Sequence, residues 1–287
     1  MTYNHEDSDI YGTYLTGGVE GMRIDISRMA DEQAKITLQE TGGLAIITIH
    51  RPHKRNALTA NMWNQLAEIG QKVLEHPKNK VLLLRGYGEQ FTAGSDIAEF
   101  NEISLEEAEH AFVLMEKAIS TIENLPLPTI GVINGPAMGA GLELALACDI
   151  RIGSEKARLG IPVGKLGITI NNKFAKRIVD LVGPSVTKEL VYLGRILKAE
   201  EAYALGMLNY LVSESELDRY AFRMGKLVAS MSPASLLAVK QSVNECTNST
   251  PALWNGSTPF VDKQDFSEGV AAFVEKRAPR FTRRTNS

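Results

Sequence analysis

Short apolar runs alternate with segments of helical spacing along most of this chain. Strands are predicted at residues 35–39, 44–50, 80–86 and 129–133, where apolar residues follow one another closely. The first two runs are separated by Glu-Thr-Gly-Gly, a sequence typical of the turn in a β-hairpin. We therefore expect the chain to begin its ordered part with a hairpin and to continue with buried strands.

Segments of helical spacing separate these strands. Helices are predicted at residues 61–75 and 105–124, the second with Ser104 as N-cap and Glu107 three residues later. Beyond Gly183 the chain becomes mostly helical, with helices expected at residues 185–193, 199–205, 216–231, 233–246 and 262–276. The alternation predicts an α/β domain with stacked or partly parallel sheets.

Residues 1–33 carry mixed polar side chains without a sustained period. We interpret them as an N-terminal extension, partly disordered or derived from cloning. The chain is long enough for one large domain, since 287 residues with 44% hydrophobic content can bury a substantial core.

Composition excludes several classes of function. A net charge of −3 without a basic stripe argues against nucleic-acid binding. Cys148 and Cys246 are too few for a disulfide framework or a zinc site, which favours a reducing compartment. The first residues lack the features of a secretory signal, so a cytoplasmic location is expected. Residues 125–148 approach membrane-spanning length but contain prolines and Glu143, so no membrane span is predicted.

The segment at residues 129–148, TIGVINGPAMGAGLELALAC, is predicted to be a strand, a tight turn and a helix that begins near Ala140. Free N–H groups at a helix start can hold a developing oxyanion. Glu143 falls on the same helix face, close to whatever those amides bind. A purely structural interpretation is also open, because a first-turn glutamate offsets the helix dipole and glycines allow close packing.

A second glycine turn, GEQFTAGSDI at residues 88–97, follows another predicted strand and could supply a second donor. With RPHKRNAL at residues 51–58, these segments resemble the enoyl-CoA hydratase/isomerase family, the crotonases. The family pattern of RPxxxNAL, FxAGxDI, a glycine-rich turn and CDI occurs here in order, and the resemblance covers about residues 35–281. It implies an α/β crotonase-like ββα spiral at residues 34–195 and a C-terminal helical trimerisation region at 196–287.

The resemblance also implies a site. The backbone amides of Ser95 and Ala140 would polarise an acyl-CoA thioester carbonyl, with each such donor worth on the order of 3 kcal/mol. Glu143 would be a catalytic acid or base, and Ala140 places a methyl group where glycine is usual. No metal and no cofactor beyond the coenzyme A of the substrate are implied, and the expected assembly is a trimer or a dimer of trimers. Substrate contacts are expected from Arg55, Ala57, Ala93, Asp96, Ile97, Val163 and Lys276.

Two basic clusters, at residues 51–55 and 276–284, fall where relatives meet the phosphates of coenzyme A. Phosphate contact and an ordinary solvated surface are both open for each cluster. Asp96 is interpreted as a residue that stabilises its loop rather than one that performs catalysis. Residues 171–173 replace a loop that is often glycine-rich in relatives, so they either reshape the acyl pocket or face water.

Val163 stands where hydratases of the family carry a second glutamate. Valine cannot transfer a proton, and apolar surroundings raise the pKa of a remaining buried carboxyl. The preferred function is therefore acyl-CoA processing of the hydratase/isomerase type with Glu143 as the lone general acid/base. Hydrolysis or decarboxylation of a CoA ester on the same scaffold stays open. A catalytically silent acyl-CoA-binding or assembly protein is the alternative from another class.

Overall fold

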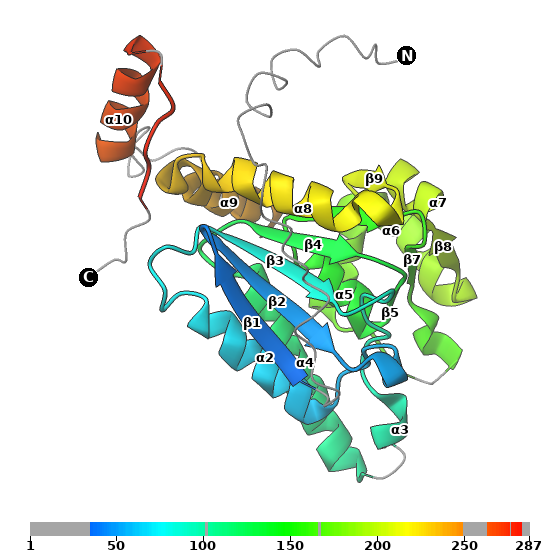
Figure 1. The fold of residues 1–287 in the computed structure, drawn as a ribbon. Helices are drawn as coiled ribbons and strands as arrows, with labels where there is room; N and C mark the ends of the chain where they lie inside the picture. Colours follow the sequence, from blue (N-terminus) through cyan, green and yellow to red (C-terminus); the bar gives the residue numbers. More distant parts are fainter. Residues whose placement is uncertain (1–34, 101–102, 166–167, 249–262, 276, 283–287) are drawn as a thin grey trace. The chain divides into compact units, whose positions relative to one another are not determined.

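The computed structural model describes residues 35–100, 103–165, 168–248, 263–275 and 277–282, and Figure 1 shows it as a ribbon. Its strands form two sheets, one of six strands in the order β1-β2-β3-β4-β6-β9 and one of three strands in the order β5-β7-β8. The predicted α/β class is confirmed. The predicted extension at residues 1–33 and the predicted contact Lys276 lie outside the described residues.

The large sheet begins with the predicted hairpin. Strand β1 (Lys35–Thr41) pairs antiparallel with β2 (Leu44–His50), and Gly42 and Gly43 between them have positive φ. The other strands then join in parallel: β3 (Val81–Gly86), β4 (Thr129–Ile133), β6 (Ile150–Ser154) and β9 (Tyr210–Val212). Parallel pairing places the exits of β3 and β4 at the same edge of the sheet.

The small sheet contains β5 (Pro136–Met138), β7 (Arg158–Gly160) and β8 (Ile196–Lys198). Strand β4 passes directly into β5, and β6 continues into β7, so successive strands leave the large sheet and enter the small one. Strands β5, β7 and β8 have only three residues each, which is too short for a periodic pattern in the sequence. Helix α5 (Ala140–Leu146) follows β5 and begins at the predicted residue.

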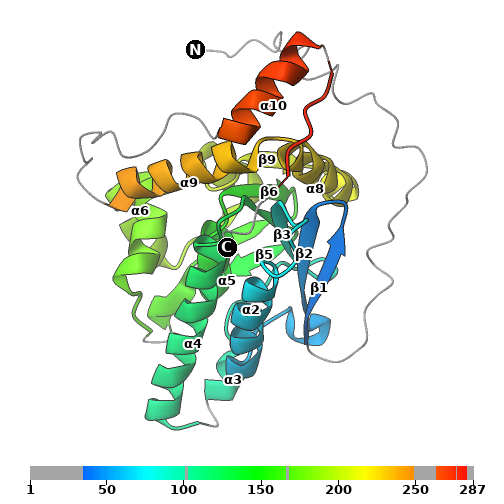
Figure 2. The same cartoon turned by 90° about the vertical axis from the view of Figure 1, so that its left-hand side faces the viewer.

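Both faces of the large sheet are covered by helices (Figures 1 and 2). Alternate residues of β2 point to opposite faces, as the period of two requires. Ile47 and Ile49 join the core formed with α2 (Ala60–Lys72) and α4 (Leu105–Glu123), whereas Leu44 and Ile46 pack with α8 (Glu214–Ala229). The predicted cap of α4 is confirmed, because Ser104 and Glu107 form a capping box.

Helix α6 (Asn172–Leu193) corrects one expectation. The sequence predicts a helix only from residue 185 and a loop at residues 171–173. Instead, the Asn171 side chain caps the helix by accepting from the Phe174 N–H at 2.7 Å. Gly183, with φ of 74°, and Pro184 kink the helix in its middle.

Short elements complete the fold: the 3₁₀ turns η2 (Pro52–Lys54) and η3 (Pro162–Lys165), and the helices α3 (Ile97–Phe100), α7 (Ala199–Ala204), α9 (Pro233–Asn248) and α10 (Lys263–Val274). Strands β8 and β9 both follow residue 195, so the C-terminal region contributes strands as well as helices. In the part of the chain that the structure describes, no helix combines the length and the apolar character needed to cross a bilayer.

Candidate active site

Two backbone turns lie against each other at the exits of β3 and β4. The turn after β3 pairs with β5 through a bridge between Thr92 and Ala137. The Thr92 N–H donates to the Pro136 carbonyl at 3.0 Å, and the Met138 N–H donates back to Thr92 at 3.2 Å. These bonds fix the position of the second turn relative to the start of α5.

Gly94 shows how closely the two turns approach. Its φ is +90°, and a methyl group on its Cα would lie 2.5 Å from the Met138 carbonyl oxygen and 3.2 Å from the Ala140 nitrogen. Only glycine can occupy this position without moving the backbone. The contact places Ser95, the next residue, beside the first turn of α5.

The N–H groups of Ser95 and Ala140 are available for a ligand. Within the described part of the chain, neither group donates a hydrogen bond. The Ser95 hydroxyl is engaged elsewhere, since it accepts from Trp63 Nε1 at 3.1 Å and contacts Met115 Sδ at 3.7 Å. If Ser95 acts on a ligand, it therefore does so through its backbone.

The segment RPHKRNAL, residues 51–58, packs against the turn that carries Ser95. Asn56 is fully buried with a φ of 55°, and its Nδ2 donates to the carbonyls of Tyr87 and Gln90 at 2.9 Å each. Its Oδ1 accepts from the Arg51 N–H at 2.9 Å. Arg51 in turn holds Asp96 through an ion pair of 2.8 Å. The segment therefore anchors the loop that carries Ser95.

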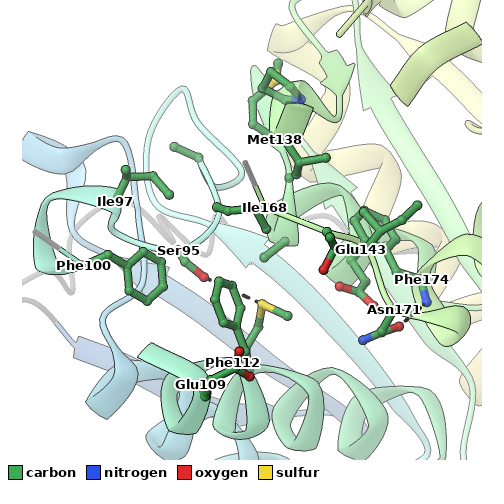
Figure 3. Close-up of a pocket in the computed structure, with 18 residues that line it drawn as sticks. Ser95, Ile97, Phe100, Glu109, Phe112, Met138, Glu143, Ile168, Asn171 and Phe174 are labelled. Carbon is green, nitrogen blue, oxygen red and sulfur yellow. Dashed lines mark hydrogen bonds between the residues drawn. The ribbon is translucent and has the colours of Figure 1, made fainter. Parts of the chain in front are cut away.

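A cavity of about 520 Å³ opens beside the two turns (Figure 3). Six of the residues named from the sequence line it together: Ala93, Ser95, Ile97, Ala140, Glu143 and Val163. Arg55, Ala57 and Asp96 lie outside its wall, so their contact with a substrate stays a prediction. The remaining wall is mostly apolar, with Phe100, Phe112, Met115, Met138, Ile168, Ile170 and Phe174.

The charged residues of the cavity wall are acidic. Glu143 and Glu109 line it, and no lysine, arginine or histidine occurs among the described lining residues. Glu109 is exposed and lies on α4 near Phe112 (Figure 3). Val163 belongs to η3 and packs against the core, so the position of the second family glutamate carries an apolar side chain at this cavity.

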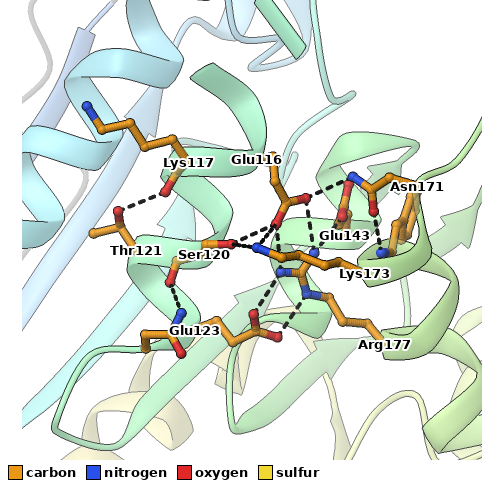
Figure 4. A network of polar contacts seen from close by, with 11 residues as sticks. Glu116, Lys117, Ser120, Thr121, Glu123, Glu143, Asn171, Lys173 and Arg177 are labelled. Carbon is orange, nitrogen blue, oxygen red and sulfur yellow. Dashed lines mark hydrogen bonds and ion pairs between the residues drawn. The ribbon is translucent and has the colours of Figure 1, made fainter. Parts of the chain in front are cut away.

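Glu143 is almost fully buried, with 1% of its surface exposed. Its backbone N–H donates to Gly139, which places the side chain in the first turn of α5. Its Oε1 accepts from Arg177 Nη1 at 2.5 Å (Figure 4). Burial raises the pKa of Glu143 to about 8; Arg177 opposes the increase, and the charge of Glu116 adds to it.

Arg177 binds two further carboxylates (Figure 4). Its Nε and Nη2 donate to Glu123 at 2.9 Å and 2.7 Å, and Nη2 also reaches Glu116 at 3.2 Å. Glu116 accepts from Ser120 at 2.7 Å and from Asn171 at 3.0 Å. Burial acts to raise the pKa of Glu116, but its hydrogen bonds from Arg177, Ser120 and Asn171 outweigh it and lower the pKa to about 2.

Sequence reasoning missed this cluster. Arg177 lies 34 residues from Glu143 and 61 from Glu116, and the three side chains come from three different helices. A glutamate on an amphipathic helix is usually solvated, so no local signal in the sequence identified Glu116. For Asn171 the sequence left two alternatives open, a place at the acyl pocket or a place in solvent. The structure shows that Asn171 lines the cavity and that it also caps α6 and donates to Glu116.

Comparison with solved structures defines the class of fold. An enoyl-CoA hydratase/carnithine racemase from Magnetospirillum magneticum superposes with a TM-score of 0.82 at 33% identity, over 87% of this chain and 96% of that one. The paired glycine turns at the sheet edge therefore belong to a crotonase-type α/β fold.

Comparison of sequences defines the family. The family model described as enoyl-CoA hydratase/isomerase matches residues 39–284. A short-chain-enoyl-CoA hydratase from Clostridium acetobutylicum is 33% identical over 86% of this chain and 97% of its own length. An enoyl-CoA isomerase/hydratase from Mycosarcoma maydis is 31% identical over 88% of this chain and 95% of its own. The chain belongs to the enoyl-CoA hydratase/isomerase family.

Proposed function

We propose that this protein rearranges the double bond of enoyl-CoA thioesters, with Glu143 as the single acid/base group. The N–H groups of Ser95 and Ala140 would bind the thioester oxygen. The observation that carries the proposal is that Ser95, Ala140 and Glu143 line one cavity, and that the N–H groups of Ser95 and Ala140 donate no hydrogen bond within the described residues. The hydratase and isomerase named among its relatives act on the same class of substrate.

The chemistry follows from where charge develops. Removal of a proton from the carbon next to a thioester creates an enolate, whose negative charge gathers on the carbonyl oxygen. Fixed N–H donors stabilise that oxygen without reorganisation, and each contributes about 3 kcal/mol. Glu143 could take the proton from one carbon and return it to another two carbons away. A single carboxyl group is sufficient for this cycle.

Isomerisation is favoured over hydration because of Val163. Adding water across a double bond requires activation of the water and delivery of a proton to the neighbouring carbon, tasks that two carboxyl groups share in two-glutamate hydratases. Val163 can perform neither task. Hydration by Glu143 alone is the second candidate, and the 33% identity to the short-chain-enoyl-CoA hydratase favours it.

The acyl group that fits this cavity is uncharged. The wall offers apolar side chains and two acidic residues, and the described lining residues include no cation to pair with an acidic acyl tail. Burying an unpaired carboxylate costs several kcal/mol. We therefore expect saturated or unsaturated hydrocarbon acyl chains to be preferred over acyl chains that end in a carboxylate.

The direct test is a substrate screen with purified protein. It would compare 2-enoyl-CoA, 3-enoyl-CoA and malonyl-CoA esters, and hydrocarbon chains with carboxylate-terminated chains of the same length. Each reaction would be repeated with Glu143→Gln and with Glu109→Gln, which alters the other acidic group of the cavity. We expect interconversion of 2- and 3-enoyl-CoA that Glu143→Gln abolishes and Glu109→Gln retains. Coenzyme A binding without turnover of any ester would instead support the silent scaffold.

The oligomeric state belongs to the same proposal. We expect a trimer or a dimer of trimers, as in the family. Exposed apolar side chains on the C-terminal half support it, for example Tyr192, which is 78% exposed, and Val239 and Val243 on α9. Light scattering coupled to gel filtration would test this expectation, and a monomer at micromolar concentration would contradict it.

A further inference from the structure

The cluster behind Glu143 holds more acidic than basic groups. Helix α4 supplies Glu116 and Glu123, helix α5 supplies Glu143, and helix α6 supplies Arg177 (Figure 4). The Nζ of Lys173, also on α6, lies 3.4 Å from Oε1 of Glu116. With all three carboxyl groups ionised, one guanidinium and one ammonium would face three negative charges.

Burial decides which carboxyl group keeps a proton in such a cluster. The side chains of Glu116 and Glu123 are 20% and 34% exposed, whereas that of Glu143 is 1% exposed. Desolvation disfavours the charged form most strongly for the most buried group. Glu116 therefore ionises before Glu143, and Glu116 and Glu123 together accept from Nε and Nη2 of Arg177.

Glu116 is connected to the cavity only indirectly. Its Oε2 accepts from Asn171 Nδ2 at 3.0 Å, and Asn171 lines the cavity, as does Glu143, whereas Glu116 does not. Any influence of Glu116 on a substrate must therefore pass through Arg177, Asn171 or Glu143. Glu109, the other acidic residue of the wall, is exposed and has no described ion pair with this cluster.

We propose that Glu116 is a positioning residue that sets the charge state of Glu143, both directly by its own negative charge and through the shared Arg177. Together with Glu123, it neutralises the guanidinium, so that Glu143 stays protonated in the resting enzyme although it touches an arginine. The inference rests on the proposed role of Glu143 as the acid/base group. It supplies a function for a carboxyl group that the catalytic cycle itself does not use.

The arrangement has a consequence for pH dependence. The pKa of Glu143 is raised to about 8, with burial as the largest cause, Arg177 opposing and Glu116 reinforcing. A reaction that begins when Glu143 removes a proton needs the ionised form, so its rate rises as pH increases toward about 8. A reaction that begins with proton donation by Glu143 falls over the same range. The pH profile therefore separates isomerisation from steps that require an acid.

Two substitutions should move this ionisation in opposite directions. Glu116→Gln removes a negative neighbour, and we expect the ionisation of Glu143 to move to lower pH by on the order of one unit. Arg177→Gln removes the cation, and we expect a shift to higher pH. Asp180→Asn is a matched control on α6, because Asp180 pairs with Lys176 at 2.6 Å and has no described bond to the cluster.

The readout should not depend on turnover alone. Infrared difference spectra between each variant and the same variant with Glu143→Gln isolate the protonated carboxyl band of Glu143 at each pH. The pH profile of kcat for 3-enoyl-CoA isomerisation provides the second readout. If the infrared transition moves but no ester is turned over, the proposed reaction fails and the positioning role stands.

Lys173→Glu covers the case in which Glu116→Gln does not fold. Lys173 is 63% exposed in the first turn of α6, where an acidic side chain is well tolerated. The added negative charge beside Glu116 should move the Glu143 transition to higher pH, and Glu116→Asp should keep it near its original position. An unchanged transition in Lys173→Glu, or an upward shift in Glu116→Gln, would overturn the proposal.

Discussion

Glu143 lies between two regions of different composition: backbone turns on one side and charged side chains on the other. On the cavity side, the proposed reaction depends on backbone amides and on glycines that let two turns touch. On the α4 and α6 side, it depends on charged side chains from separate helices that meet at Arg177. Under the two proposals, one side would determine where a substrate oxygen binds, whereas the other would determine whether Glu143 carries a proton.

The largest expected effect comes from the cavity side, where a change in the backbone would displace an amide. Gly94→Ala would bring a methyl group within 2.5 Å of the Met138 carbonyl oxygen and displace the Ser95 amide. Loss of one oxyanion donor typically lowers kcat by about 10²–10³-fold. Steady-state kinetics of the isomerisation would measure the loss.

Gly88→Ala is the matched control for that substitution. Gly88 also has a positive φ, of +70°, but its added methyl group would have no atom within 4 Å. We expect a loss of stability of about 1 kcal/mol with kcat nearly unchanged. If both variants lose activity equally, backbone strain rather than the position of the amide explains the effect.

The second prediction concerns the stability of the charged side. The pKa of Glu143 is raised from its ordinary value of 4.5 to about 8, so its stabilising contribution is complete below pH 4.5 and is lost as pH rises to about 8. Glu143→Gln removes this loss and retains an acceptor for Arg177. Thermal melts at pH 5 and pH 9 should therefore show Glu143→Gln gaining several degrees over wild type at pH 9 only. An equal difference at both pH values would contradict the raised pKa.

The third prediction concerns Val163, which stands where two-glutamate hydratases carry their second carboxyl group. Val163→Glu introduces a second carboxyl group at the cavity wall, and we expect hydration of short 2-enoyl-CoA to increase by about tenfold or more. The same change should lower the melting temperature, because a poorly paired carboxylate in an apolar wall is costly. A folded variant without any gain in hydration would mean that the rest of the cavity is shaped for another reaction.

The smallest expected effect concerns coenzyme A. Arg51 is held by Asp96, so Lys54 and Arg55 remain the exposed basic groups of the first cluster. If they contact phosphates, calorimetric affinity for coenzyme A should fall severalfold between low and physiological salt, because exposed charges are screened over about 10 Å at 0.1 M. The Lys54→Gln, Arg55→Gln double variant should lose most of this salt dependence. Unchanged salt dependence in that variant would assign the phosphate contact to other residues.

The difference between the two regions also explains what the sequence could predict. Ser95, Ala140 and Glu143 sit in contiguous segments where apolar strands run into glycine turns, and both segments lie at the exits of parallel strands. The turns indicated that two backbone donors could be present, and the resemblance to the family assigned them to Ser95 and Ala140. The family, the α/β fold and the cavity position of these three residues were therefore accessible from the sequence.

The cluster of charged side chains around Arg177 could not be predicted from the sequence, for physical reasons. Its contacts join residues far apart in the chain, and the first half of α6, which carries Arg177, is not predicted as a helix although Phe174 and Ile178 are one turn apart. The short strands β5, β7 and β8 were missed because three residues show no periodicity. Long-range pairing of charges emerges only when the helices are packed.

Isotope transfer tests most directly whether Glu143 alone carries the proton. A 3-enoyl-CoA ester labelled with deuterium at the carbon next to the thioester would be converted in ordinary water. Because Glu143 is 1% exposed, the account predicts that part of the deuterium returns to the substrate at the new position. Complete replacement of the label by solvent hydrogen, with activity retained in Glu143→Gln, would contradict it.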